Sequence, residues 1–252
     1  MSALLSIKNL WKDFGGFVAT RDITFDLEEG ERHAIIGPNG AGKTTFFNLI
    51  TGHMHPSKGS VEFRGKDITG IPPHKVVKLG IARSFQRINI FPRMSVFENV
   101  QVALMSREDQ SLKMFKLCFD LHVAETNQLL DTVGLLTEAE ETAGELAYGK
   151  QKQLELAIAL AENPDVLLLD EPTAGMSPTE TGDAIKLVDR ITKERGLTLL
   201  FTEHDMGVVF GISDRISVLH HGEIIASGLP DDVRNDPEVR RIYLGEDADA
   251  AA

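Results

Sequence analysis

The first part of the chain alternates short apolar runs with polar turns, a pattern that predicts β-strands. Residues 4–14 (LLSIKNLWKDF) and 23–29 (ITFDLEE) alternate with a period of about two. Residues 34–36 form a short apolar strand that meets Gly37. A helix carrying Phe46, Phe47, Leu49 and Ile50 is then expected from Lys43, with Gly52 ending it. A further strand is expected at residues 60–63, and PPHKVVKLG predicts a short helix with proline in its first turn.

The middle of the chain has a helical pattern from about Ser95 to Ala161, and strand and helix then alternate again. Residues 166–170 (VLLLD) and 197–202 (LTLLFT) are continuous apolar runs, as expected of central strands covered on both faces. A helix is predicted between them, a hairpin with its turn at His221-Gly222-Glu223 follows, and one or two short helices close the chain. The pattern predicts an α/β core with a partly parallel sheet and a helical insertion.

One stretch, LAYGKQKQLELAIAL (residues 146–160), leads from a glycine-containing turn into a helix. Leu154, Ala157, Ile158 and Ala161 have the i, i+3, i+4, i+7 spacing of a single apolar helical face. The helix pattern alone does not decide whether the turn is only a helix entry or a binding element.

Composition narrows the class of protein. The 252 residues carry a net charge of −12, which argues against a general nucleic-acid binder, although it leaves room for a local basic groove. A single cysteine, Cys118, excludes an intrachain disulfide and fits a reducing compartment. No secretory signal is evident, and no run of about 18 uncharged apolar residues occurs. We therefore expect any work at a membrane to proceed through a partner.

The segment GPNGAGKTT fits the phosphate-loop pattern G-x-x-x-x-G-K-[ST], with an apolar strand before it and an amphipathic helix after it. Glycines let backbone N–H groups curl around phosphate oxygens, and the helix N-terminus adds its positive dipole end. Lys43 would reach the β- and γ-phosphates, and Thr44 would offer a hydroxyl to Mg²⁺. The expected phosphate-binding residues are Gly37, Pro38, Asn39, Gly40, Ala41, Gly42, Lys43, Thr44 and Thr45.

An acidic pair follows the apolar run VLLLD. Asp170 ends the strand and is predicted to hold Mg²⁺, usually through water. Glu171 comes next, and a carboxylate there can orient or deprotonate an attacking water. Without the phosphate loop, the pair would be read as a helix cap.

With these landmarks in order, nearly the whole chain resembles an ABC-type ATPase, the nucleotide-binding subunit of an ATP-binding cassette transporter. The resemblance implies that Gln86, in RSFQRINIF, is the Q-loop glutamine and a Mg²⁺ ligand. His204, in LLFTEHD, matches the family's switch histidine, and Phe14 matches the aromatic residue that stacks on adenine. Taken singly, these three would be read as an ordinary polar residue, a surface histidine and a core aromatic.

The resemblance gives the turn at residues 146–150 a role. LAYGK resembles the LSGGQ signature, which presents a helix N-terminus to the γ-phosphate of ATP held by the other subunit. The expected contact residues are Leu146, Ala147, Tyr148, Gly149 and Lys150. Ala147 lacks the signature's serine hydroxyl, and Lys150 adds a charge that could partly compensate. Ser177 stands where the family's D-loop has aspartate, which puts the coupling through that residue in doubt.

The departures point to a subfamily. The form of the signature, the segment SFQR through SVFENVQVALM, and the ending PDDVRNDPEVRRIYLGE resemble ATPase subunits of branched-chain amino-acid importers. The alternatives are a soluble non-transport ABC ATPase of the cluster-assembly type and the ATPase of an exporter. Two histidine pairs, His53/His55 and His220/His221, sit at expected turns without a third ligand nearby and are not read as metal sites.

The resemblance implies a P-loop NTPase (RecA-like) core with an N-terminal antiparallel β subdomain and an inserted α-helical subdomain. The nucleotide-binding core would comprise residues 1–90 and 162–245, the helical subdomain 91–161, and a disordered tail 246–252. Glu171, His204, Lys43 and Gln86 are the expected catalytic residues. The implied ligands are ATP and Mg²⁺, and the implied partners are a second ABC ATPase subunit, in a homo- or heterodimer, and transmembrane permease subunits.

A substrate-binding protein is implied as an indirect partner, and nucleic acid is not. The chain would work in the cytoplasm, on the inner face of the cell membrane. Phe91, Pro92 and Met94 form an apolar cluster just after the Q-loop. They are read equally well as local core packing or as a groove for a permease's coupling helix.

Overall fold

The computed structural model describes residues 3–84, 88–108 and 121–244 of the chain. The expected disordered tail at 246–252 lies outside this described part.

The chain forms two compact units. The first contains residues 1–76 and 196–252, and the second contains residues 77–195. The second unit is wider than the helical subdomain predicted at 91–161, since it also holds two strands and a further helix. The predicted domain boundaries stay a prediction.

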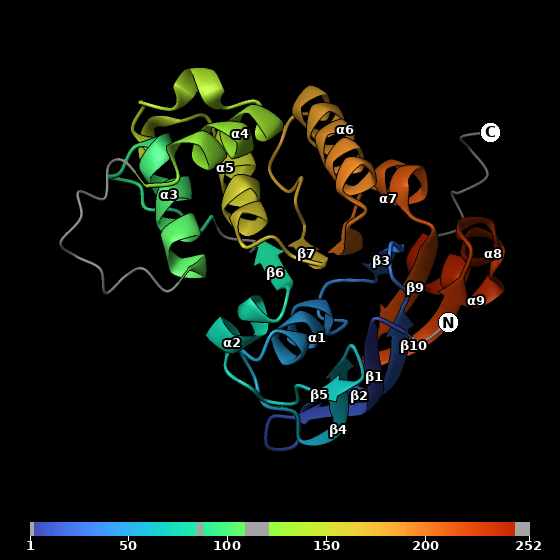
Figure 1. Ribbon diagram of the computed structural model, residues 1–252. Coiled ribbons are helices and arrows are strands. Elements are labelled where there is room, and N and C mark those ends of the chain that lie inside the picture. Colours follow the sequence, from blue (N-terminus) through green and yellow to red (C-terminus); the bar gives the residue numbers. More distant parts are fainter. Residues whose placement is uncertain (1–2, 85–87, 109–120, 245–252) are drawn as a thin grey trace. The chain divides into compact units, whose positions relative to one another are not determined.

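An antiparallel sheet occupies the N-terminal part of the first unit, with strand order β2-β1-β4-β5 (Figure 1). Its strands are β1 (Leu5–Asp13), β2 (Val18–Leu27), β4 (Lys58–Phe63) and β5 (Lys66–Asp67). Asp13 pairs with Val18, so β1 and β2 are joined by a tight hairpin. Gly15 and Gly16 in the turn have φ values of 69° and 111°. Positive φ at both central residues favours glycine and matches the twist of the paired strands.

Four strands of the first unit follow one another in the order β10-β9-β3-β8. They are β3 (Arg32–Ile36), β8 (Thr198–Thr202), β9 (Arg215–His220) and β10 (Glu223–Gly228). β3 runs parallel to both β8 and β9, whereas β10 returns antiparallel to β9 after the turn at His221-Gly222. All five residues of β8 are buried, which confirms the predicted central strand.

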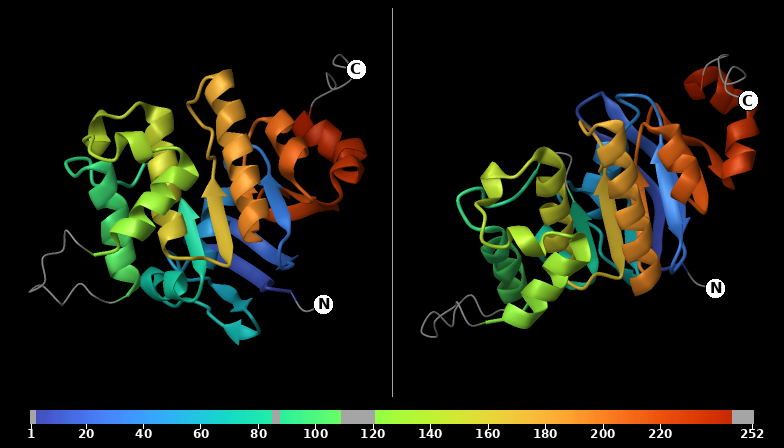
Figure 2. Two further views of the ribbon diagram at one scale, coloured as in Figure 1. Left: turned by 45° about the horizontal axis from the view of Figure 1, so that its top comes forward. Right: turned by 90° about the horizontal axis from the view of Figure 1, so that it is seen from above.

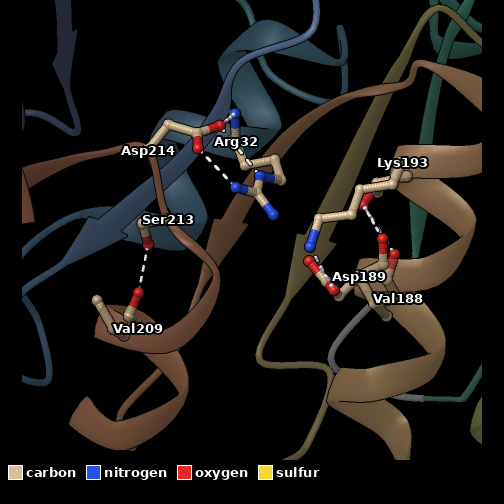
Figure 3. A network of polar contacts seen from close by, with 8 residues as sticks. Arg32, Val188, Asp189, Lys193, Val209, Ser213 and Asp214 are labelled. Atoms are coloured by element: carbon tan, nitrogen blue, oxygen red, sulfur yellow. Dashed lines mark hydrogen bonds and ion pairs between the residues drawn. The ribbon is translucent and has the colours of Figure 1, made fainter.

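The helices of the first unit are short. They are α1 (Lys43–Ile50), α2 (Pro73–Lys78), which crosses the unit boundary, α7 (Met206–Ile212), α8 (Pro230–Asn235), α9 (Pro237–Val239) and a π-helical turn, Arg240–Leu244. Asp205 caps α7 by accepting hydrogen bonds from the backbone N–H groups of Gly207 and Val208. Where α7 ends, the Ser213 hydroxyl donates to the Val209 carbonyl at 2.6 Å (Figure 3).

An ion pair joins the start of β3 to the turn before β9. The guanidinium of Arg32 donates two hydrogen bonds to the carboxylate of Asp214, at 2.6 and 3.0 Å (Figure 3). The backbone N–H of Arg32 donates to the same carboxylate at 2.9 Å. This arrangement holds the entry of the strand that leads to the phosphate loop.

The second unit combines a parallel strand pair with helices. β6 (Ile81–Ser84) pairs in parallel with β7 (Val166–Asp170). The helices are α3 (Val96–Arg107), α4 (Val123–Val133), α5 (Tyr148–Ala161) and α6 (Pro178–Arg195), with 3₁₀ turns at Leu136–Glu138 and Ala143–Glu145. α3, α4 and α5 pack against one another, as both views in Figure 2 show. On α6, Lys193 pairs with Asp189 one turn earlier, at 2.8 Å (Figure 3).

The single apolar face predicted for α5 is wrong. Leu154, Ala157 and Ala161 are buried, but Ile158 is only half-buried. The helix also buries residues outside the predicted face: Lys152, Glu155, Leu156, Ala159 and Leu160. The reason is position, because α5 contacts α3, α4 and β6, and a helix enclosed in this way is buried on most of its circumference.

None of the helices in the described residues combines the length and apolar character needed to cross a bilayer.

Candidate functional site

The glycine-rich loop connects β3 to α1, as the sequence predicted. Gly37, Gly40 and Gly42 have φ values of 153°, 80° and 109°, which side-chain-bearing residues rarely adopt. A Cβ on Gly37 would lie 2.0 Å from the Leu219 carbonyl oxygen. A Cβ on Gly42 would lie 2.5 Å from the carbonyl oxygen of Ala19. Both positions therefore require glycine, for conformation and for space.

The rest of the loop has the character of an anion site. Lys43 is buried, and its ammonium donates to the carbonyl oxygens of Gly37 at 2.6 Å and Pro38 at 3.3 Å. These two hydrogen bonds hold the positive charge of Lys43 next to the loop. Thr44 is exposed and Thr45 half-buried in the first turn of α1, where backbone N–H groups have no intrahelical partner. Asn39 is exposed, Pro38 half-buried and Ala41 buried. Together, the loop amides, the helix dipole and Lys43 provide the elements of a phosphate cradle.

Two neighbouring segments of the first unit pack against this loop. Ala19, near the start of β2, approaches Gly42, and the Gly222 N–H donates to the Ala41 carbonyl at 2.9 Å. Phe14 lies at the tip of the β1–β2 hairpin, where its N–H donates to the Phe17 carbonyl. The Phe14 side chain is 49% exposed, and the Lys12 ammonium lies 5.1 Å from its ring centroid. Phe14 is therefore a surface aromatic, which suits a stacking role better than a core role.

His204 follows β8, and β8 pairs in parallel with β3. The carboxyl ends of parallel neighbours meet at the same sheet edge, so His204 and the phosphate loop share that edge. His204 is exposed, and its backbone N–H donates to the carboxylate of Glu203 at 3.0 Å. Glu203 is buried, with 3% of its surface exposed, and it is not among the site residues predicted from the sequence.

In the second unit, Asp170 ends β7 and is buried, as predicted. Its Oδ2 accepts a hydrogen bond from Nη2 of Arg83 at 2.8 Å. Arg83 lies on β6, and its side chain is 5% exposed. Burial lowers the pKa of Arg83 from its ordinary value, and the charge of Asp170 opposes that change. This partner was missed, although an arginine inside the short apolar run before the Q-loop was a usable signal. Gln86 lies outside the described residues.

Glu171 has a φ of 51°. A non-glycine residue in this left-handed region costs of order 1 kcal/mol, and such strain occurs often at functional positions. The side chain is half-buried, and the Glu171 carbonyl accepts a hydrogen bond from the Ala174 N–H at 3.1 Å. The turn after β7 thus holds Glu171 in a defined conformation beside Asp170.

The signature turn forms the start of α5, with Ala147 at the N-cap and no side chain capping it. Leu146 is buried, whereas Tyr148 is 42% exposed. The first-turn residues Tyr148, Gly149 and Lys150 leave their backbone N–H groups without intrahelical acceptors. The side-chain amide of Gln151 donates to the Leu146 carbonyl at 2.9 Å and steadies the turn. The helix N-terminus therefore presents backbone donors of the kind that suit a negative group.

Lys150 and Ser177, the two charged or polar departures from the family pattern, both have partners in the second unit. The Lys150 ammonium is paired with the carboxylate of Glu138. Ser177 caps α6: its hydroxyl donates to the Glu180 carboxylate at 2.6 Å and accepts from the Glu180 N–H at 3.4 Å. Gly175 lies next to the ring of Tyr148: a Cβ added to Gly175 would lie 3.6 Å from a ring carbon of Tyr148. The signature turn and the D-loop are thus in contact within one chain.

The histidines of the two turn pairs have other contacts. His53 Nδ1 lies 2.9 Å from the Thr51 hydroxyl. The rings of His220 and His221 lie 4.1 Å apart between centroids.

Comparison with known proteins places the chain. Residues 20–174 match the family described as ABC transporter, and residues 223–249 match the family described as branched-chain amino acid ATP-binding cassette transporter. The high-affinity branched-chain amino acid transport ATP-binding protein LivG of Salmonella typhimurium is 38% identical over 254 residues. That match covers 96% of this chain and 98% of LivG.

Two solved structures are also similar. The ADP conformation of MJ1267, an ATP-binding cassette of an ABC transporter, has a TM-score of 0.85 and 32% identity. It covers 98% of this chain and 100% of MJ1267. MJ0796, described as a dimeric bacterial ABC transporter cassette, has a TM-score of 0.75 and 25% identity over 90% of this chain and 98% of its own.

Proposed function

Because the chain belongs to the ABC transporter family and is an ATP-binding, ATP-hydrolysing cassette, we propose that it drives the uptake of branched-chain amino acids or related small polar solutes. The observation that carries this proposal is the phosphate loop between β3 and α1, in a chain similar to LivG over nearly its whole length. The match of residues 223–249 to the branched-chain amino acid family supports the substrate class.

Within the first unit, the proposed nucleotide contacts start from the loop at residues 37–45. Its amides and Lys43 hold the phosphates, and Phe14 stacks on adenine. His204 stabilises charge that develops on the phosphoryl oxygens. The parallel pairing of β3 with β8 supports this role, since it brings His204 to the edge that bears the loop.

A magnesium ion fits the proposed ligands by their chemistry. Thr44 would supply a hydroxyl and Asp170 a carboxylate, the hard oxygen donors that Mg²⁺ prefers. Gln86 would add an amide oxygen. When bound, the metal neutralises phosphate charge in the transition state.

Hydrolysis requires a positioned water, and Glu171 is the residue proposed to polarise it for in-line attack on the γ-phosphate. Its strained backbone and its place directly after Asp170 support this assignment. A carboxylate held in this way needs little reorganisation at the moment of reaction.

The signature turn, residues 146–150, is proposed to face the γ-phosphate of ATP on a second ABC ATPase subunit. Two such subunits would close head to tail over two ATP molecules, so that nucleotide occupancy shifts an open–closed equilibrium. The uncapped N-terminus of α5 supports this role, because its donors suit an anion. The second subunit is either a copy of this chain or a similar ATPase.

The proposed contact with the membrane partner is the cluster Phe91, Pro92 and Met94. The Phe91 side chain is 53% exposed, while its backbone N–H and carbonyl are both bonded to the Asn99 side chain, at 2.8 and 3.1 Å. A rigid backbone that presents an exposed aromatic ring favours a docking role over core packing. This contact would hold the chain on the inner face of the cell membrane, against the permease's coupling helix.

The proposal is tested by purifying the tagged chain from membranes and identifying its partners by mass spectrometry. We expect two permease-like proteins and a second short ATPase, with a substrate-binding protein that can then be screened for amino-acid ligands. Phe91→Ser should lose the permeases while ATP binding remains. Recovery of soluble partners alone would contradict the transport role and favour a soluble non-transport ABC ATPase. It would not affect the assignment of ATP hydrolysis.

A further inference from the structure

Phe14, the residue proposed to stack on adenine, has a cation over one face of its ring. The Lys12 ammonium lies 5.1 Å from the ring centroid, within the range at which an aromatic ring attracts a cation. The Phe14 side chain is still 49% exposed, so Lys12 restricts the ring without covering it.

Lys12 is itself held by a second contact. Its ammonium donates a hydrogen bond to the carbonyl oxygen of His55 at 2.8 Å, and the residue is half-buried. A lysine side chain on a surface usually samples many rotamers, and fixing it costs conformational entropy. The hydrogen bond to His55 and the contact with the Phe14 ring together favour one position of the ammonium.

Two further hydrogen bonds tie the end of β1 to residues 55–57. The backbone N–H of Ser57 donates to the Trp11 carbonyl at 2.7 Å. The Ser57 hydroxyl accepts from the backbone N–H of Asp13 at 3.0 Å. The Asp13 carboxylate in turn accepts from the Gly16 N–H at 2.8 Å, across the hairpin tip. The tip that carries Phe14 is therefore fixed to residues 55–57 by backbone and side-chain contacts.

Residues 55–57 follow closely after the helix that begins at the phosphate loop. This helix, α1, ends at Ile50, and the Met54 N–H donates back to the Asn48 carbonyl at 3.0 Å. All of these residues belong to the first unit. The ring proposed to bind the base and the helix that starts at the phosphate loop are thus linked through His55. A site whose base and phosphate subsites are held at the right spacing before ATP arrives has less to order on binding.

From these contacts we propose that Lys12 is a positioning residue for the nucleotide base: anchored on His55, it holds one face of the Phe14 ring, so that the other face meets adenine at a fixed spacing from the phosphate loop. The ring then loses little freedom when the base binds, which lowers the entropic cost of stacking. Lys12 acts through Phe14 and does not touch the nucleotide itself. The inference rests on the proposed stacking role of Phe14.

The test is calorimetric titration of the full chain with ATP and with inorganic tripolyphosphate, which has the phosphates but no base. Lys12→Met keeps an unbranched side chain and removes the cation. Its affinity for ATP should fall by about two- to fivefold, the usual size of a cation–π contact at an exposed site. Its affinity for tripolyphosphate should not change. A general loosening of the fold would weaken the binding of both ligands, so the comparison separates positioning of the base from a structural role.

Lys58→Met is the matched control, because the Lys58 ammonium lies 5.7 Å from the ring centroid of Trp11, an aromatic with no proposed contact to the nucleotide. This variant should bind ATP as the unsubstituted chain does. Lys12→Arg keeps a cation that can stack on an aromatic face and should bind ATP within about twofold of the unsubstituted chain. Lys12→Met combined with Phe14→Ala should lose no more ATP affinity than Phe14→Ala alone, since Lys12 acts through the ring.

Four results would overturn the proposal. They are unchanged ATP affinity in Lys12→Met, equal losses for ATP and tripolyphosphate in that variant, an equal loss of ATP affinity in Lys58→Met, and a further loss in the double variant. If Phe14→Ala itself binds ATP with unchanged affinity, the stacking role of Phe14 fails, and the inference fails with it. If Phe14→Ala weakens ATP binding and Lys12→Met does not, only the inference about Lys12 fails.

Discussion

Lys150, in the signature turn, forms an ion pair with Glu138, the last residue of the 3₁₀ turn Leu136–Glu138. The hydrogen bond raises the pKa of Lys150 and lowers that of Glu138. The resemblance of LAYGK to the LSGGQ signature makes Lys150 a charge that the signature lacks. In the structure, that charge is already engaged by a carboxylate of the same chain.

Removing the carboxylate should release Lys150 toward phosphate. Glu138→Gln is expected to lower the KM for MgATP by about two- to threefold, since an exposed pair contributes little. The effect should vanish when Lys150→Gln is added to Glu138→Gln. Steady-state ATPase assays on the three variants measure it, and an equal effect with and without Lys150 would contradict a role for this ammonium.

Glu171 is predicted to be needed for hydrolysis and not for binding. Glu171→Gln keeps the size of the side chain but removes the base, so kcat should fall by about 10²- to 10⁴-fold. ATP should remain bound, and gel filtration with ATP should show a lasting dimer. ATP hydrolysis near the normal rate in this variant would contradict the proposal that Glu171 polarises the attacking water.

Gly37 and Gly40 allow a comparison of two glycines in one loop. Both have positive φ, but a Cβ meets the Leu219 carbonyl at 2.0 Å only at Gly37, while nothing lies within 4 Å at Gly40. Gly40→Ala should cost about 1 kcal/mol of unfolding free energy. Gly37→Ala should cost roughly 2–5 kcal/mol and also abolish ATP binding, because the loop must shift. Nucleotide-free denaturation measures both, and equal costs would argue against the close approach.

Phe14 and Phe17 allow a similar comparison at the hairpin tip. Both rings are exposed, at 49% and 66%, so removing either should leave the core unchanged. Phe14→Ala should weaken ATP binding by about 1–3 kcal/mol, the usual contribution of stacking on one base. Phe17→Ala should bind ATP normally in calorimetric titration. A larger loss of ATP affinity with Phe17→Ala than with Phe14→Ala would show that Phe17, not Phe14, stacks on adenine.

Glu31 gives the first unit a pH dependence. Burial acts to raise the pKa of Glu31, but hydrogen bonds from His33 and the Glu28 N–H, with the charges of His33 and Arg215, hold it below its ordinary value of 4.5. A lowered folded pKa stabilises the fold above the unfolded pKa, and this is lost as pH falls through the folded pKa. Glu31→Gln should cost about 1.5–3 kcal/mol near pH 7.

That cost should begin to shrink as pH falls below about 4.5, the ordinary pKa that Glu31 has in the unfolded chain, and it should vanish once pH has passed through the lower pKa of Glu31 in the folded chain. Urea denaturation of both proteins between pH 3 and 7 measures the difference. If the difference in unfolding free energy between the two proteins did not vary with pH, the charge of Glu31 would not contribute to stability.

The phosphate loop, the strand before it and the helix after it could be predicted from the amino-acid sequence, because their determinants are local. Gly37, Gly42 and Lys43 stand at spacings that allow a strand–loop–helix turn, and apolar runs such as that of β8 mark buried strands without reference to the rest of the chain. The hairpin at His221-Gly222 could be predicted for the same reason.

The contacts of the candidate site depended on the tertiary structure. Arg83 and Asp170 are 87 residues apart in sequence, so only the pairing of β6 with β7 brings them together. The burial of Lys152 and Glu155 depends on α5 being enclosed by α3, α4 and β6. A periodic pattern predicts which face of a helix is apolar. It does not predict how many other elements pack against that helix. Which charges a fold buries, and against which partners, is decided by packing between distant segments.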